Sequence, residues 1–204
     1  NMVAYQGSAA ANRIFSVIDK PIEIKNDVSL PNLETKNFDI KFNNTSFKYD
    51  TTSDKAISNI NLSIDGGKIT ALVGQSGAGK STIINLLPRF YDPQEGKILI
   101  DDQDIKKVNL SSLRNNISLV SQDVILFDDT IKNNIAYANS SANQKDIEDA
   151  CKFAAADEFI NLLPDKYETM VGENGVKLSG GQKQRISIAR AILKKSPIIL
   201  LDEA

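Results

Sequence analysis

The chain has 204 residues, a length that fits one large domain or two small ones, and 41% of the residues are hydrophobic. A formal net charge of −2 argues against a nucleic-acid-binding module, because such modules carry a basic surface. One cysteine and no histidine exclude an internal disulfide, a histidine metal site and a histidine general base within the chain.

The N-terminal part of the chain divides into a helix and a linker. Residues 1–20 carry apolar residues at helical spacing, and Pro21 ends the pattern. Residues 21–37 are polar and proline-containing, which is typical of a linker. No apolar run approaches the roughly 20 residues that cross a bilayer. Because the chain does not start with Met and stops close after an apolar run, we expect an excerpt of a longer protein.

Strands are predicted next along the chain. Apolar and polar residues alternate through residues 38–64, which predicts antiparallel strands with one solvent-facing side. Residues 69–73 (ITALV) and residues 198–201 (IILL) are continuous apolar runs, which predict strands buried on both faces of a parallel sheet. Residues 97–100 and 117–120 are predicted as further strands.

Helices are predicted at residues 81–90, over most of residues 130–163 and at residues 182–194. The last of these gathers its apolar residues on one side. Its cations lie elsewhere around the helix and are Arg185, Arg190 and Lys194. Strands and helices in this order predict an α/β fold.

The sequence GQSGAGKST at residues 74–82, here called the phosphate loop, matches the pattern G-x-x-x-x-G-K-S/T between a predicted strand and a predicted helix. Its glycines let backbone N–H groups point at phosphate oxygens. Lys80 would carry its charge to the β- and γ-phosphates of ATP, and the Ser81 hydroxyl would ligate Mg²⁺. The predicted nucleotide-binding residues are Gly74, Gln75, Ser76, Gly77, Ala78, Gly79, Lys80, Ser81 and Thr82. A chance glycine turn does not account for this setting.

Two carboxylates, Asp202 and Glu203, directly follow the apolar run at residues 198–201. In open α/β sheets, ligands bind at the carboxyl ends of the strands. Asp202 is therefore a candidate to hold Mg²⁺, directly or through water, and Glu203 a candidate to accept a proton from the attacking water. Alone, such a pair would be a solvated loop, but the phosphate loop in the same chain favours the functional interpretation.

A second loop of small residues, LSGGQ at residues 178–182, leads into a predicted helix. Ser179, Gly180 and Gly181 could present N–H groups and a hydroxyl to an anion. Equally, Ser179 could simply cap the helix. The residues alone do not decide between these two interpretations, nor whether the two loops share one nucleotide.

In this order, residues 74–82, 178–182 and 198–203 resemble the nucleotide-binding domain of the ABC ATPase family, and LSGGQ followed by KQRISIARAIL is close to diagnostic. The resemblance covers about residues 38–204. It implies a P-loop NTPase fold with a RecA-like core, an antiparallel β subdomain at about 38–70 and an inserted helical subdomain at about 123–170. Residues 1–37 would be the end of the last membrane helix and the linker into the ATPase domain.

The resemblance also assigns roles to single residues. Tyr49 in FKYD matches the aromatic residue that stacks on adenine, although by itself it could be an ordinary strand-face tyrosine. Gln122 in LVSQD matches the glutamine that senses Mg²⁺ and the γ-phosphate. Glu173 in TMVGENG matches an acidic residue that in exporters contacts intracellular loops of the membrane domain. The resemblance thus implies Glu203, Lys80 and Gln122 as catalytic residues, and Ser81, Gln122 and Asp202 as Mg²⁺ ligands.

The family pattern further implies partners and a location. In the family, the signature loop of one domain closes over the ATP held by a second domain, which implies a homodimer. The signature residues acting in trans would be Leu178, Ser179, Gly180, Gly181 and Gln182. Residues 126–135 and 1–20 resemble exporters of the lipid or multidrug type. The chain would then drive export of a lipid or hydrophobic compound from the cytoplasmic face of the inner membrane, coupled to a transmembrane domain and without nucleic acid.

One departure keeps other functions open. The family continues past Glu203 with a loop that contacts the partner and a histidine that holds the γ-phosphate, and this chain contains no histidine. We therefore expect poor ATP turnover from the chain alone. A remnant that binds ATP without turnover is one alternative, and a non-transport ABC ATPase is another. The DNA-repair type of such an ATPase is disfavoured, because no sustained heptads separate the two loops.

Overall fold

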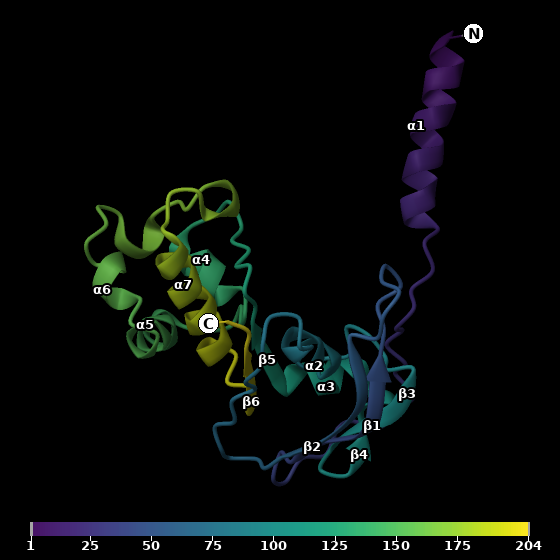
Figure 1. Ribbon diagram of the computed structural model, residues 1–204. Helices are drawn as coiled ribbons and strands as arrows, with labels where there is room; N and C mark the ends of the chain where they lie inside the picture. The colour runs from purple at the N-terminus through teal and green to yellow at the C-terminus, as the bar shows by residue number, and fades with distance from the viewer. Residues whose placement is uncertain (1, 204) are drawn as a thin grey trace.

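The computed structural model describes residues 2–203, so the predictions that include Asn1 and Ala204 lie outside it at those two positions. Helix α1 (Met2–Ile18) confirms the helix predicted near the N-terminus, and it projects from the rest of the chain as a separate rod (Figure 1). Ile14, Phe15, Val17 and Ile18 near its end are exposed. None of the helices in residues 2–203 has the length and hydropathy that a membrane crossing requires.

The linker after α1 is fastened to the body of the protein in its second half. Leu33 is buried, and its backbone N–H donates a 3.0 Å hydrogen bond to the hydroxyl of Ser112. The carboxylate of Asp101 accepts hydrogen bonds from the backbone N–H groups of residues 36–39, at 2.6–3.1 Å. These contacts fix the path by which the chain enters its first sheet.

The first sheet confirms the predicted antiparallel strands. It has the order β2-β1-β3-β4, with Ile40 opposite both Ile64 and Ile100. Its strands are β1 (Ile40–Phe47), β2 (Ile57–Ile64), β3 (Glu95–Ile100) and β4 (Gln103–Asp104). Because β3 and β4 belong to it, the sheet extends past the predicted range of about 38–70. Phe42, Ile98 and Ile100 are almost fully buried beneath it and form the centre of the first core cluster.

A second sheet joins β5 (Ile117–Val120) and β6 (Ile198–Leu201) in parallel, with Val120 opposite Leu201. The prediction of a buried strand at residues 69–73 is wrong. This segment belongs to no sheet within residues 2–203, and Ile69 and Val73 are fully or almost fully exposed. A strand is held by the hydrogen-bond ladder of a neighbour, and here no backbone hydrogen bond joins the segment to β6 across the described chain.

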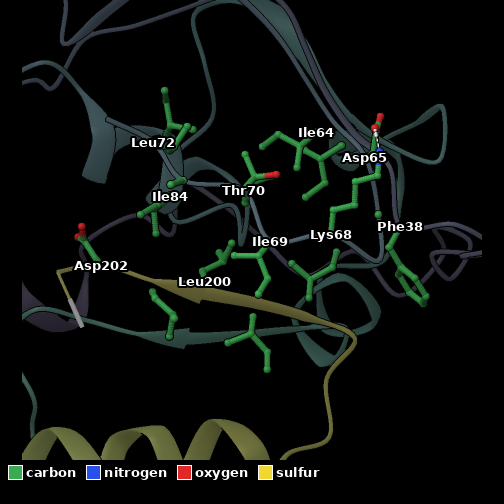
Figure 2. A pocket seen from close by; sticks show the side chains of 18 of the residues that line it. Phe38, Ile64, Asp65, Lys68, Ile69, Thr70, Leu72, Ile84, Leu200 and Asp202 are labelled. Atoms are coloured by element: carbon green, nitrogen blue, oxygen red, sulfur yellow. Dashed lines mark hydrogen bonds and ion pairs between the residues drawn. The ribbon is translucent and has the colours of Figure 1, made fainter. Parts of the chain in front are cut away.

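A cleft of about 540 Å³ separates residues 69–73 from β6. Ile69 and Leu72 line one wall and Leu200 the other (Figure 2). As a result, β6 is less buried than predicted: Ile198 is buried, whereas Ile199 and Leu201 are 49% and 53% exposed. Without a neighbour on this side, β6 has an unpaired edge within the part of the chain that the structure describes.

The remaining helices lie on two sides of the second sheet. Helix α2 (Lys80–Leu86) is shorter than predicted because Pro88 has no N–H to continue the helical hydrogen bonds, and Arg89 after it has a left-handed φ of 52°. Helix α2 and α3 (Leu110–Asn115) lie toward the antiparallel sheet (Figure 1). The opposite, helical lobe confirms the other predicted helices. It consists of α4 (Ile131–Ala136), α5 (Gln144–Phe153), α6 (Asp157–Ile160) and α7 (Gly180–Leu193). Short 3₁₀ turns are η1 (Ile105–Lys107), η2 (Lys166–Glu168) and η3 (Glu173–Gly175).

The helical lobe has its own core, to which α4, α5, α6 and α7 all contribute. Ile135, Ile147, Ile160 and Ile186 are almost completely buried in it. The fold is therefore α/β, as predicted, with an antiparallel sheet at one end, a small parallel sheet in the middle and helices at the other end (Figure 1).

Candidate functional site

The phosphate loop is an exposed turn that leads into α2. Gly77 and Gly79 have φ values of 79° and 85°, a region that favours glycine. A Cβ on Gly79 would lie 2.5 Å from the Cγ2 of Ile57 and 2.7 Å from the backbone oxygen of Ala56. A Cβ on Gly77 would meet nothing within 4 Å. Gly79 is therefore required for the close passage of the loop beside β2, and Gly77 only for its backbone angle.

Lys80 lies at the start of α2 with its side chain folded over the phosphate loop. Its ammonium donates hydrogen bonds to the backbone oxygens of Gly74 and Gln75, both at 2.9 Å. Backbone oxygens can partner an ammonium only weakly compared with a charged phosphate. A phosphate bound in the loop would replace these backbone oxygens as the partner of the Lys80 ammonium. The ammonium therefore already lies where it can bind a phosphate.

Ser81 and Asp202 meet although they are far apart in sequence. The Ser81 hydroxyl donates a 3.0 Å hydrogen bond to the Asp202 carboxylate, and the Asp202 backbone N–H donates to the oxygen of Val120. Hydroxyl and carboxylate oxygens are the ligands that Mg²⁺ prefers. Within residues 2–203, no group of three or more His, Cys, Asp or Glu side chains could hold a metal ion. A magnesium site here would consequently need the Ser81 hydroxyl and the Gln122 amide oxygen beside Asp202.

Gln122 and Glu203 meet at the same edge of the second sheet. The side-chain amide of Gln122 donates a 2.5 Å hydrogen bond to the Glu203 carboxylate. Gln184, on α7, donates a 3.2 Å hydrogen bond to the backbone oxygen of Glu203. The residue after β5, the residues after β6 and one turn of α7 therefore converge beside the start of α2. Gln184 lies in the KQRISIARAIL segment that resembles the family, but the sequence did not assign it a role of its own.

Tyr49 lies beside the phosphate loop in a cluster of aromatic rings. Its hydroxyl donates a 3.2 Å hydrogen bond to the Thr82 hydroxyl on α2. Its ring packs edge-on against Phe47 and Tyr91, with centroid distances of 4.8 and 5.1 Å. Tyr91 was missed in the sequence, because it follows a helix and belongs to no alternating pattern. These contacts hold the Tyr49 ring next to the loop.

The signature loop caps α7. The Ser179 hydroxyl accepts a hydrogen bond from the Gln182 N–H at 3.3 Å, and the Gln182 side chain accepts one from the Ser179 N–H at 2.9 Å. Leu178 is buried, whereas Gly180 and Gly181 are exposed and have open space around them. Ser179 therefore caps α7, as one of the two interpretations of this loop predicted.

The signature loop and the phosphate loop are separate sites within this chain. Across residues 2–203, no hydrogen bond joins residues 178–182 to residues 74–82. Glu173, the other residue that the family pattern singles out near the signature loop, is exposed at the start of η3.

Arg190 does not lie where the helical pattern placed it. The sequence put this cation away from the apolar side of its helix, but its half-buried guanidinium contacts the segment that follows Gln122. Its position one turn after the buried Ile186 was the available signal. Its main partner, the fully buried Asn134, lies in residues 126–135, which resemble exporters, but the sequence assigned it no role of its own.

Comparison with known proteins gives one family. Residues 57–204 match the family described as ABC transporter. Proteins named ATP-dependent lipid A-core flippase from Syntrophus aciditrophicus and Photorhabdus laumondii are 50% and 52% identical over 207 and 200 residues, or 100% and 98% of this chain. The protein of that name from Escherichia coli K12 is 48% identical over 98% of the chain.

The chain spans 34% of the length of each of these relatives. Among solved structures, a bacterial Atm1-family ABC exporter with ATP bound superposes with a TM-score of 0.90 at 45% identity. That match covers 98% of this chain and 35% of the exporter. The similarity therefore extends over nearly all of this chain and over about a third of the larger proteins.

Proposed function

The chain belongs to the ABC transporter family, and on that basis we propose that it is the ATP-binding part of an exporter that moves a lipid or another hydrophobic compound. Relatives named as lipid flippases at 48–52% identity support this class of cargo. The observation that carries the proposal is the convergence of Ser81 with Asp202 and of Gln122 with Glu203 beside the phosphate loop. This arrangement supports the proposal, because it brings together the residues that would bind phosphate, hold Mg²⁺ and accept a proton.

The residues take the following roles in this proposal. The loop amides of residues 74–79 and the ammonium of Lys80 bind the phosphates of ATP, and the Tyr49 ring stacks on adenine. Ser81, Gln122 and Asp202 hold Mg²⁺, which when bound neutralises phosphate charge at the reacting group. Gln122 orients the attacking water, and the carboxylate of Glu203 accepts its proton.

The signature loop acts on a second copy of the chain in this proposal. Gly180 and Gly181 are exposed at the N-terminus of the 14-residue α7, where backbone N–H groups favour an anion. In the family pattern this loop closes over ATP that a second domain holds, so we assign the nucleotide of the signature loop to the partner copy. A head-to-tail homodimer with two ATP molecules follows.

The membrane connection is part of the same proposal. Glu173, exposed beside the signature loop, contacts the intracellular loops of a transmembrane domain. Residues 1–37 link that domain to the ATPase domain at residues 38–204. The assembly then lies at the cytoplasmic face of the inner membrane.

Nucleotide binding is the direct test of the proposed site. Lys80→Ala should weaken MgATP binding by about 100-fold, the equivalent of about 2.7 kcal/mol, because it removes the side-chain cation that faces the phosphates. Isothermal titration calorimetry measures this affinity. Lys97→Ala is the matched control, since Lys97 is an exposed lysine on β3 away from the loop. Equal affinities for the two variants would refute the phosphate-binding role.

Export is tested with the full-length protein in lipid vesicles. ATP should drive movement of a fluorescent phospholipid between the two leaflets, measured by dithionite quenching, and Glu203→Gln should abolish it. ATP binding without turnover would instead identify a binding-only protein. Turnover without any lipid movement or lipid stimulation would favour a non-transport ATPase.

A further inference from the structure

Asn134, on α4, is a fully buried side chain that organises the loop before its helix. Its side-chain oxygen accepts a hydrogen bond from the Phe127 N–H at 2.9 Å, and its amide donates to the backbone oxygens of Phe127 and Thr130 at 3.0 and 2.9 Å. Buried polar groups that are all satisfied specify one backbone arrangement. Asn134 therefore fixes residues 127–130 in a single conformation.

Arg190, on α7, fastens this fixed loop to the signature helix. Its guanidinium donates to the side-chain oxygen of Asn134 at 2.6 Å, to the backbone oxygen of Asn134, and to the backbone oxygen of Ile125 at 2.7 Å. It also lies over the Phe127 ring, 5.8 Å from the centroid. No carboxylate pairs with it among the ion pairs of residues 2–203. Its specific partners are thus the oxygens and the ring of one segment.

The two ends of this connection are the two functional loops. Ile125 follows Gln122 by three residues, and Gln122 contacts Glu203 at the chain's own ATP site. Arg190 lies on the same helix that the signature loop caps. A helix transmits displacement along its axis because its backbone hydrogen bonds make it stiff. A shift of the signature loop would therefore reach Gln122 through Arg190.

We propose that Arg190 and Asn134 form a latch that couples the signature loop of one copy to the Gln122–Glu203 pair of the same copy, and so makes the two ATP sites of the dimer cooperative. This inference rests on the proposed function, in which the signature loop touches the partner's ATP. ATP bound by the partner pulls on α7, and the latch passes that displacement to Gln122. Arg190 and Asn134 are positioning residues in this scheme, because neither touches nucleotide.

Lys194, the C-cap of the same helix, provides a matched control. Its ammonium donates to the backbone oxygens of Arg114 and Ile117, both at 2.6 Å. Like Arg190, it is a half-buried cation that binds carbonyl oxygens. Its partners, however, lie in α3 and β5 rather than in the segment after Gln122. Removing its contacts should cost stability without interrupting the latch.

The first experiment compares Arg190→Lys with Lys194→Met in the full-length protein. Lysine keeps the charge at residue 190 but cannot reach three oxygens in a fork. We expect Arg190→Lys to keep its ATP affinity within about twofold, to lower kcat by about 10-fold, within the usual range of coupling between sites, and to bring the Hill coefficient for ATP close to one. Lys194→Met should lower the Tm and keep the wild-type Hill coefficient. An unchanged Hill coefficient in Arg190→Lys, or an equal fall in both variants, would overturn the latch.

The second experiment needs no ATP. Hydrogen exchange of the Phe127 amide should be faster in Arg190→Lys than in wild type, and unchanged in Lys194→Met. Equal exchange in all three proteins would refute the latch. If Lys80→Ala shows that the chain does not bind ATP as proposed, this exchange result still stands by itself. Arg190→Gln, which removes the guanidinium fork and keeps a single amide donor group, replaces Arg190→Lys should that variant fail to fold.

Discussion

The side-chain amide of Gln122 donates its hydrogen bond to the carboxylate of Glu203 because the register of two parallel strands puts both residues at one edge. Val120 lies opposite Leu201, and each functional residue follows two positions later. A shift of the register by one residue would turn one of the two side chains to the other face of the sheet. The pairing of β5 with β6 is therefore what assembles the site.

Glu203→Gln should separate nucleotide binding from hydrolysis. Glutamine still accepts a hydrogen bond but cannot take a proton from water, so we expect turnover of the full-length protein to fall at least about 100-fold, as is usual for loss of a general base. ATP affinity should stay within about threefold. Phosphate release and calorimetry measure the two quantities. Glu158→Gln, at an exposed glutamate on α6, is the control; steady turnover by Glu203→Gln would remove Glu203 from the mechanism.

Gly79→Ala should damage the phosphate loop more than Gly77→Ala. Both residues have a left-handed backbone, which costs alanine about 1–2 kcal/mol. Only at Gly79 would the new methyl group also collide with Ile57 and the backbone of Ala56, for a further cost of about 1–3 kcal/mol. Urea unfolding should show the larger loss of stability for Gly79→Ala, together with weaker ATP binding. The same loss in both variants would mean that the backbone angle alone decides.

Much of this site could be predicted from the sequence. A small-residue loop between a strand and a helix, and carboxylates directly after an apolar run, are local patterns. Ligands bind at the carboxyl ends of strands in open α/β sheets, so Asp202 after the run at residues 198–201 was expected to lie near the phosphate loop, and its carboxylate does accept a hydrogen bond from Ser81. The antiparallel pairing of β1 with β2 could also be predicted, because alternating apolar and polar residues indicate strands with one buried and one solvent-facing side.

Two features could not be predicted, because they depend on contacts with residues far away in the sequence. Residues 69–73 have the composition of a buried strand, but a strand forms only against a hydrogen-bonding partner, and β6 lies across a cleft from them. Helical spacing placed Arg190 away from the apolar side of its helix, yet oxygens of Ile125 and Asn134 in another segment hold it. The presence or absence of hydrogen-bond partners far away in the sequence therefore decided both outcomes, against what composition and periodicity had indicated.

Asp101 should make the stability of the chain depend on pH. Partial burial would raise the pKa of this carboxyl, but the four backbone N–H groups of residues 36–39 together lower the pKa below its usual value. The folded state then holds the proton less tightly than the unfolded state. Its contribution is therefore present above the unfolded pKa, near 4, and is lost as the pH falls through the lower folded pKa.

The corresponding variant is Asp101→Asn. At pH 7 it should lower the free energy of unfolding by about 1–2 kcal/mol, because the charged acceptor is lost. At pH 3 the difference from wild type should be smaller, as measured by urea unfolding. Asp102→Asn is the control, since Asp102 is 77% exposed in its ion pair with Lys41 and such pairs contribute little. If Asp101→Asn lowers the free energy of unfolding equally at pH 3 and pH 7, the charge of Asp101 is not the source of its contribution.

Ile199→Lys should reduce self-association of this chain in the absence of nucleotide. Strand β6 has an unpaired edge within the described residues, and Ile199 and Leu201 are about half exposed there. Such an edge can pair with another chain, whereas a lysine on it opposes pairing by its charge and its need for water. Light scattering after size exclusion should show larger species for wild type and mainly monomer for Ile199→Lys. Leu162→Lys removes an 86% exposed apolar side chain that lies outside any strand; if it works equally well, general surface hydrophobicity rather than the strand edge causes the association.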